Sequence, residues 1–364
     1  MGGDNMKKHE LLTIVLFCGF LLSMTLGFFL LPKSEFSVNE KRFLAEAPDV
    51  TWDNISSGDW GNDIESYLAD HIPGRDFFVG LNAYFELLTG RQVGKDIRAE
   101  GGKLLEAPLK ANEAAIARNM KAINSFAENV QHPVDLMIIP SAGWAMGLEG
   151  YQDEQIIHSI YGQAKTVGPL NVCDQFAEKP ELYYDTDHHW TSEGAYTAYR
   201  FYMKRTGRWF RTEDHFSVET VSGFQGSTYS RSALWLTEGE NLELWHGSDG
   251  LTVTNAETEM RHEGVFYRER LEEADKYTVY LDGNHPIVRI QNPNAEGKLL
   301  VIRDSYSNSL GCFLAESYGE VVLIDLRYYR QPVSQLVAEE TFDDILICYS
   351  IGNFMTDTNL VWLR

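Results

Sequence analysis

The chain has 364 residues, of which 44% are apolar and 12% aromatic, so it has enough hydrophobic side chains for at least one large core and does not belong to the disordered class. Its 53 acidic and 31 basic side chains give a formal net charge of −22. This charge argues against nucleic acid as a partner, because affinity for a phosphate backbone comes from Lys and Arg.

The first feature in chain order is an apolar segment, residues 11–31, which contains no charged side chain. As a helix it would be long enough to span the roughly 30 Å hydrocarbon core of a bilayer. Lys7 and Lys8 precede it, and this positive flank predicts that residues 1–10 are cytoplasmic and that the chain after Pro32 lies outside. A cleaved signal peptide is the alternative, but the run is long for one and no A-x-A-type site follows. We therefore expect a single-pass transmembrane anchor in the cell membrane.

Residues 32–100 are predicted to form a membrane-proximal stem. Proline and glycine residues interrupt this stretch, and between them the segment 60–88 carries apolar and aromatic side chains three or four positions apart. This spacing predicts two short amphipathic helices.

From residue 101 to 364, short apolar runs alternate with helical patterns. We expect strands at 134–139, 182–187, 298–303, 321–326 and 345–349, and helices at 111–129, 192–206, 309–317 and 333–340. Apolar strands that are separated by helices indicate an α/β fold with a parallel sheet covered on both faces. Residues 208–296 break the rhythm and predict a β-rich insertion, with strand-like pieces at 276–281 and 287–290.

Two of the ten histidines, His188 and His189, lie in the sequence YYDTDHHWT at the expected junction of a strand and a helix. An open α/β sheet places functional residues at such junctions. In an extended segment Asp187 and His189 share one face, so the carboxylate can orient the imidazole as in a Ser-His-Asp triad. A metal site with Asp and His ligands is the alternative, but no H-E-x-x-H motif or second cluster completes it. We expect no metal and no other cofactor.

The nucleophile that such a pair requires is predicted at Ser305, in the turn between the strand 298–303 and the following helix. A hydroxyl there would lie at the carboxyl edge of the sheet, near N–H groups of the helix start that could stabilise an oxyanion. The alternative is that Ser305 or Ser307 only caps the helix. The G-x-S-x-G motif of α/β-hydrolases is absent.

Together these segments resemble the DHHW proteins, a branch of the SGNH-hydrolase-like proteins related to the alginate O-acetylation proteins. The resemblance is carried by DHHWT at 187–191, RDSYSNS at 303–309 and DLRYY at 325–329, and also by NEKRFLA at 39–45 and YLADHIPGRD at 67–76. It implies a flavodoxin-like SGNH fold with permuted catalytic motifs, in which the Asp-x-His motif precedes the serine.

The resemblance also implies acyl chemistry, with Ser305 as nucleophile, His189 as general base and Asp187 orienting the histidine. Related proteins act outside the cytoplasmic membrane and move acetyl groups onto polysaccharides, often beside a multispanning membrane acyltransferase. We therefore expect an extracytoplasmic, membrane-anchored serine O-acyltransferase or esterase that acts on O-acetyl groups of a cell-surface or cell-wall polysaccharide.

Several further residues are candidates for contacts with the substrate or the oxyanion: Arg303, Asn308, Arg327, Tyr306 and Trp190, together with the backbone at Gly226 and Ser227. Arg303 stands where a G-D-S serine motif has glycine, and Arg327 could instead pair with Asp325 or Asp304. The aromatic side chains could stack on sugars or belong to the core. A second hypothesis is therefore a non-catalytic carbohydrate-binding or assembly protein of a polysaccharide acetylation system.

Overall fold

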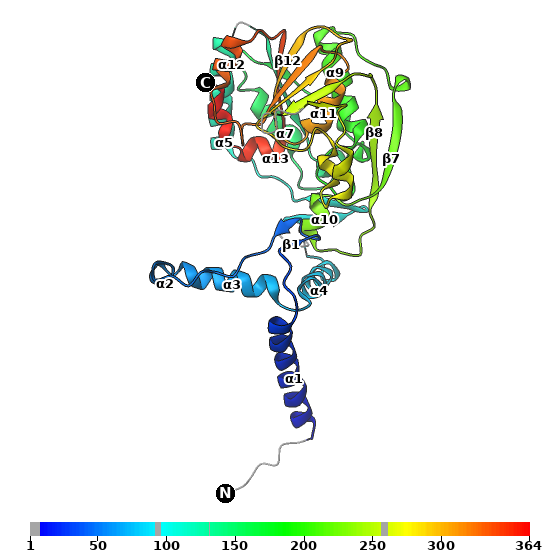
Figure 1. Cartoon of the computed structure of the whole chain (residues 1–364). Coiled ribbons are helices and arrows are strands. Elements are labelled where there is room, and N and C mark those ends of the chain that lie inside the picture. Colours follow the sequence, from blue (N-terminus) through cyan, green and yellow to red (C-terminus); the bar gives the residue numbers. More distant parts are fainter. Residues whose placement is uncertain (1–7, 92–95, 131, 256–260) are drawn as a thin grey trace. The chain divides into compact units, whose positions relative to one another are not determined.

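The computed structural model describes residues 8–91, 96–130, 132–255 and 261–364 (Figure 1). The chain divides into two compact units. The first comprises Met1–Gly94 and the short segment Ala233–Trp235, and the second comprises Lys95–Ser232 and Leu236–Arg364.

The first unit begins with helix α1 (Lys8–Leu30), none of whose side chains is buried. This helix is long and apolar enough to cross a membrane, which agrees with the expected anchor. The two expected amphipathic helices are confirmed as α3 (Asp59–His71) and α4 (Arg75–Leu88). Each starts directly after a glycine in the left-handed conformation, a backbone geometry that glycine adopts without steric cost. The remaining elements of this unit are α2 (Trp52–Ser57) and the short strands β1 (Phe36–Ser37) and β2 (Arg42–Phe43).

The second unit is built on an eight-stranded sheet in the order β10-β9-β11-β13-β12-β14-β5-β6. Five neighbouring strands pair in parallel: β13 (Glu320–Ile324), β12 (Lys298–Arg303), β14 (Asp344–Ser350), β5 (Val134–Ile139) and β6 (Gly168–Leu170). Three more join by antiparallel pairing: β9 (Thr252–Asn255), β10 (Arg261–Glu263) and β11 (Ile287–Gln291). The expected α/β fold with its central apolar strands is confirmed.

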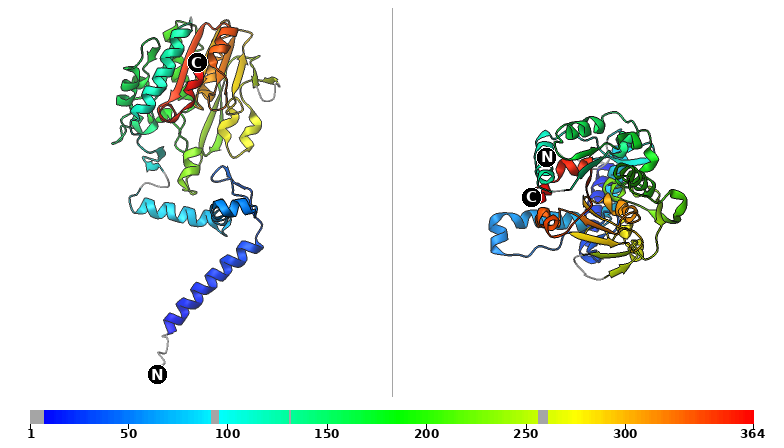
Figure 2. Two further views of the ribbon diagram at one scale, coloured as in Figure 1. Left: turned by 90° about the vertical axis from the view of Figure 1, so that its left-hand side faces the viewer. Right: turned by 90° about the horizontal axis from the view of Figure 1, so that it is seen from above.

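Helices cover both faces of this sheet (Figure 2). Side chains alternate along a strand, so Leu299 and Val301 of β12 enter one core while Leu300 and Ile302 enter the other. The first core is closed mainly by α8 (Cys173–Phe176), α9 (Ser192–Thr206) and α11 (Ser307–Leu314). The second is closed by α5 (Glu113–Asn129), α7 (Asp153–Tyr161), α12 (Val333–Glu339), α13 (Ile351–Thr356) and the 3₁₀ helix η5 (Asn359–Leu363).

Shorter elements connect these layers. They are the hairpin of β3 (Ile97–Glu100) and β4 (Lys103–Glu106), the ladder of β7 (Ser217–Phe224) and β8 (Glu240–His246), the helices α6 (Ala142–Ala145) and α10 (Ser227–Ser232), and the 3₁₀ helices η1 (Pro180–Leu182), η2 (Glu213–His215), η3 (Arg268–Glu272) and η4 (Lys276–Val279). The stem boundary expected at residue 100 falls inside the first hairpin, and the second unit begins at Lys95 instead.

Two expected strands are wrong. The segment 182–187 forms the end of η1 and a loop, because the backbone N–H groups of Asp185 and Thr186 donate to the Glu240 carboxylate and not to a neighbouring strand. The segment 276–281 begins with η4, which Thr278 closes through a hydrogen bond from its hydroxyl to the Asp275 carbonyl. The β-rich region 208–296 is also less separate than expected, since β9, β10 and β11 extend the main sheet.

The sheet core should dominate the stability of the second unit. Leu300 in the central strand β12 is fully buried, and Leu300→Ala should lower the free energy of unfolding by about 2–5 kcal/mol through lost burial and a residual cavity. Leu236→Ala removes the same atoms from a side chain that is 82% exposed, and it should change the free energy of unfolding by less than about 0.5 kcal/mol. Urea unfolding followed by circular dichroism measures both, and equal effects would contradict this assignment of the core.

Candidate active site

The three residues of the expected Ser-His-Asp arrangement come together in the second unit. His189 Nε2 lies 2.8 Å from Ser305 Oγ, across a sequence separation of 116 residues. His189 Nδ1 hydrogen-bonds Asp187 Oδ1. Asp187 and His189 are buried, and Ser305 is 8% exposed. Because an ionised carboxylate only accepts hydrogen bonds, Nδ1 carries the ring proton and Nε2 is the acceptor for the Ser305 hydroxyl.

Backbone N–H groups hold the Asp187 carboxylate in place. Oδ1 accepts from the His189 N–H at 2.9 Å and Oδ2 accepts from the Ser227 N–H at 2.6 Å. Glycine is required at 226, because a Cβ atom there would lie 2.1 Å from the Cβ of Asp187. The backbone at Gly226 and Ser227 therefore positions the aspartate, while its contact with an oxyanion stays a prediction.

The electrostatics of this pair follow from its surroundings. Burial alone would raise the pKa of Asp187, but the imidazoles of His189 and His188 and the hydrogen bonds outweigh burial and hold this pKa well below its ordinary value. Burial, reinforced by the neighbouring His189, lowers the pKa of His188. Asp187 is therefore a carboxylate at neutral pH, as an orienting residue must be.

Asp304 shapes the turn that presents Ser305. Its Oδ1 accepts from the Tyr306 N–H at 3.0 Å, and its Oδ2 accepts from the Ser350 N–H and from Asn353 Nδ2, both at 2.8 Å. Helix α11 has no side-chain cap, so the alternative in which Ser305 or Ser307 serves only as a helix cap is wrong. The Ser305 hydroxyl is directed to His189 instead.

Aromatic side chains enclose the histidine. The Tyr277 ring stacks on the His189 ring with centroids 4.0 Å apart and an interplanar angle of 9°. The Trp190 indole N–H donates to the Tyr306 carbonyl at 3.0 Å and the Tyr306 hydroxyl donates to the His188 carbonyl. Trp190 is wholly buried and Tyr306 nearly so, and both fasten the histidine loop to α11. The structure thus gives both side chains a packing role, and their contact with substrate stays a prediction.

The remaining candidates form a charged cluster beside the turn. Arg303 is fully buried, and its Nη1 donates to Asn284 Oδ1 at 2.9 Å, which also accepts from Asn308 Nδ2 at 3.2 Å. Among the described residues, Arg303 Nε and Nη2 and Asn308 Oδ1 have no hydrogen-bond partner. Arg327 makes the pairing with Asp325 that the sequence left open, through Nε at 2.9 Å and Nη2 at 2.5 Å.

The metal alternative does not fit the donor atoms. Asp187, His188 and His189 do offer ligand atoms within 4.8 Å of one another. However, both Asp187 oxygens accept backbone N–H groups, His189 Nε2 faces Ser305 Oγ, and His188 Nδ1 lies 2.5 Å from Ser227 Oγ. A metal ion bound through these ring nitrogens would displace their hydrogen bonds to Ser305 and Ser227, so the observed contacts favour proton transfer over metal binding.

Comparison with protein families gives one match in this region: the model of the DHHW proteins matches residues 153–324, which include the whole Asp187-His189-Ser305 arrangement. This segment is therefore similar to the DHHW proteins. The DHHW segment runs from α7 to the end of β13, and so it includes both motifs that build the site.

Solved structures agree with this assignment of the fold. A DHHW family protein from Eubacterium siraeum superposes with a TM-score of 0.63 at 21% identity and covers 74% of this chain and 97% of that chain. Bacillus cereus PatB1, in a structure with a sulfonyl adduct, gives a TM-score of 0.59 at 21% identity and covers 72% and 96%. The O-acetyltransferase domain of Pseudomonas putida AlgJ is more distant, with a TM-score of 0.46 at 13% identity over 74% and 95%. No curated protein sequence matches this chain.

Several residues that build the site were missed in the sequence. Tyr277 lay in a segment expected to be a strand, and Asn284 and Glu240 carry no local pattern that connects them to the DHHW motif. Asp304 was visible as part of RDSYSNS, but its bonds to Ser350 and Asn353 depend on the neighbouring strand β14. The Asp-x-His spacing and the turn that carries Ser305 were the parts of the site with a local signal in the sequence.

The low pKa of Asp187 makes its contribution to stability depend on pH. A carboxyl group whose pKa is lowered on folding stabilises the fold above its unfolded pKa, about 3.9, and loses this effect as the pH falls toward the folded value. The difference in unfolding free energy between the native protein and Asp187→Asn should therefore be constant between pH 5 and pH 7 and shrink below about pH 4. Urea unfolding across this range measures it, and a difference that stays constant down to pH 3 would contradict the lowered pKa.

Proposed function

We propose that this protein is a membrane-anchored serine O-acyltransferase or esterase that acts outside the cytoplasm on O-acetyl groups of a cell-surface or cell-wall polysaccharide. The observation that carries the proposal is the continuous hydrogen-bond relay from Asp187 through His189 to Ser305 Oγ. Such a relay activates a hydroxyl that is otherwise a weak nucleophile at neutral pH.

The chemistry proceeds in two balanced steps. Ser305 Oγ attacks the carbonyl carbon of an acetyl ester while its proton passes to His189 Nε2, and the donor alkoxide leaves with that proton as the acetyl-serine forms. A sugar hydroxyl, or water in an esterase, then gives its proton to Nε2 and takes the acetyl group, and Ser305 regains its proton. Asp187 remains ionised and stabilises the imidazolium in both steps.

The oxyanion of each tetrahedral intermediate needs donors near Ser305. In the turn, the N–H groups of Tyr306 and Ser307 already donate to Asp304, and that of Asn308 donates to the Ser305 carbonyl. We therefore assign the Ser305 N–H as the backbone donor. The buried guanidinium of Arg303 supports it with positive charge at a site of low dielectric, and Asn308 positions the shared partner Asn284.

The substrate and location come from the family and the anchor. The DHHW match and the resemblance to the alginate O-acetylation proteins support polysaccharide as the acceptor. Helix α1 with Lys8 at its start supports a single-pass protein whose second unit is extracytoplasmic. A multispanning membrane acyltransferase would then supply the acetyl group from the other side of the membrane.

Covalent labelling tests the nucleophile. The full-length protein in detergent should hydrolyse an aryl acetate and react with an aryl sulfonyl fluoride or a fluorophosphonate, since these reagents form adducts with an activated serine. Ser305→Ala should abolish labelling and, like His189→Ala, lower kcat by about 10³-fold or more. Ser66→Ala in α3, a serine whose hydroxyl bonds only its own helix, is the matched control.

Unchanged turnover in Ser305→Ala would contradict the assignment of the nucleophile. If the native protein binds an acetylated glycan without any turnover, and binding persists in both Ser305→Ala and His189→Ala, the non-catalytic carbohydrate-binding function is correct instead.

A further inference from the structure

Exposed apolar side chains are concentrated in the first unit of the chain. Among the described residues of 32–91, thirteen large apolar side chains are exposed, in addition to those of α1. The described residues of 96–364, a segment more than four times as long, have only five. Scattered exposed apolar residues need no explanation, but a concentration of this kind marks a contact surface.

Helix α4 carries the densest part of this surface. With 100° per residue, Phe77, Phe78, Leu81, Phe85 and Leu88 fall within an arc of about 100°. Their exposed fractions range from 39% for Phe78 to 86% for Leu88. No charged side chain interrupts the arc, which is called the α4 apolar face below.

The opposite side of α4 is packed. Gly80 and Ala83 are buried, and a Cβ atom at Gly80 would lie 2.8 Å from the Trp235 ring. The Trp235 indole N–H donates to the Asp76 carbonyl at 2.9 Å. The helix is therefore fixed on one side within its own unit, while Phe77, Leu81, Phe85 and Leu88 of the α4 apolar face are largely exposed.

Helix α4 also packs against α1. The rings of Phe78 and Phe20 meet edge to face with centroids 6.4 Å apart. At the loop before α4, a Cβ atom at Gly27 would lie 3.0 Å from Pro73. Phe20 belongs to the apolar run of α1, so this contact joins α4 to the apolar surface of that helix.

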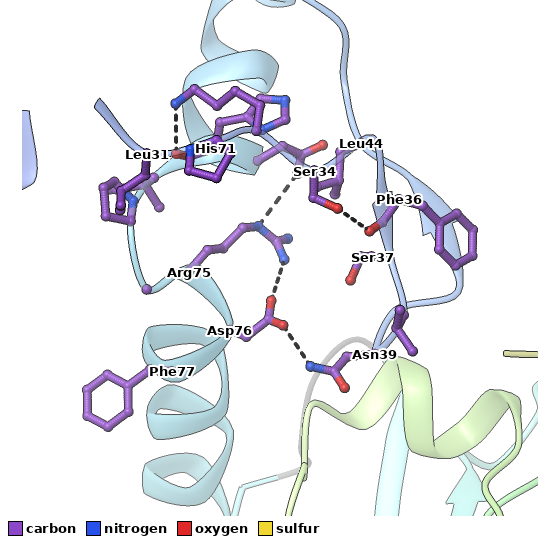
Figure 3. Close-up of a pocket in the computed structure, with 17 residues that line it drawn as sticks. Leu31, Ser34, Phe36, Ser37, Asn39, Leu44, His71, Arg75, Asp76 and Phe77 are labelled. Atoms are coloured by element: carbon purple, nitrogen blue, oxygen red, sulfur yellow. Dashed lines mark hydrogen bonds and ion pairs between the residues drawn. The ribbon is translucent and has the colours of Figure 1, made fainter. Parts of the chain in front are cut away.

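Several charged side chains of this unit pair with one another, and Figure 3 shows Arg75 beside Asp76. Arg42 bonds Asp70 at 2.6 Å and holds the pKa of Asp70 at about 2, and Arg75 bonds Glu40 at 2.5 Å. Asp70 and Arg75 also line a cavity of about 470 Å³. The paired residues belong to the segments 39–45 and 67–76. Because these cations already have carboxylate partners, they offer no unpaired cluster for anionic lipid, and the contact surface of the unit is apolar.

We infer that the α4 apolar face lies in the interface of the bilayer that α1 spans, with Phe77, Leu81, Phe85 and Leu88 inserted at the boundary between headgroups and acyl chains. The occupant is lipid because the face continues the lipid-facing surface of α1 through the contact of Phe78 with Phe20. The inference rests on the proposed anchoring role of α1. It makes the first unit a platform that is attached to the membrane by two helices, one spanning and one lying in the surface.

Spin labelling of the full chain in phosphatidylcholine nanodiscs tests the inference. Cys18→Ala removes the exposed native cysteine, while Cys173, Cys312 and Cys348 are buried and remain. Single labels at Leu81→Cys on the α4 apolar face, Asn82→Cys on the adjacent exposed polar side and Leu16→Cys in α1 are compared by collision with oxygen and with a water-soluble nickel chelate. The ratio of oxygen to nickel accessibility should be several-fold higher at positions 81 and 16 than at 82.

Three other accessibility results would each contradict the inference, and each points to a different environment for the α4 apolar face or for α1. A label at 81 that is as accessible to nickel as the label at 82, with 16 still in lipid, places the face in water. Low accessibility of 81 to both reagents means that a protein covers the face. A nickel-accessible label at 16 means that α1 does not span the bilayer, and the proposed anchoring role then fails as well. The proposed catalytic role of Ser305 is tested independently, by turnover of the aryl acetate.

Discussion

The carboxylate of Asp304 is the constraint on which the arrangement of the site depends. It is buried at the end of β12, and it bonds the turn before α11, the end of β14 and the first turn of α13. Hydrogen bonds to a buried charge are each worth about 1.5–3 kcal/mol, more than bonds between neutral groups. One side chain thus joins the carboxyl ends of two parallel strands and forces Ser305 to the edge of the sheet, where an open α/β fold places its chemistry.

The second half of the site is a loop that has no regular structure of its own. Glu240 binds the N–H groups at its start, Ser227 binds Asp187 in its middle, and Trp190 fastens its end to α11. These bonds come from three separate parts of the chain. They leave Asp187 and His189 little freedom, and preorganisation of this kind is what a proton relay requires, because a histidine held in one tautomer needs no rearrangement when the serine reacts.

The two units differ in where they place their apolar side chains. In the second, apolar side chains enter two cores on either side of the sheet, and hydrogen bonds connect the buried polar side chains of Asp187, His189 and Ser305. In the first, charges are paired internally and apolar side chains face outward. Such a surface is costly in water and favourable in lipid, which is the reverse of the usual arrangement of a soluble domain.

The sequence by itself determined the features that depend on neighbouring residues. Periodicity located α9 and β12 and the apolar helix α1. The Asp-x-His spacing predicted the pairing of Asp187 with His189, although the segment is a loop and not the expected strand. Only the tertiary structure decided the long-range partners. It stacked Tyr277 on His189, buried Trp190, paired Arg327 with Asp325 and brought Ser305 to the histidine. Contacts of this kind depend on how strands order within a sheet, and local propensity carries no record of that order.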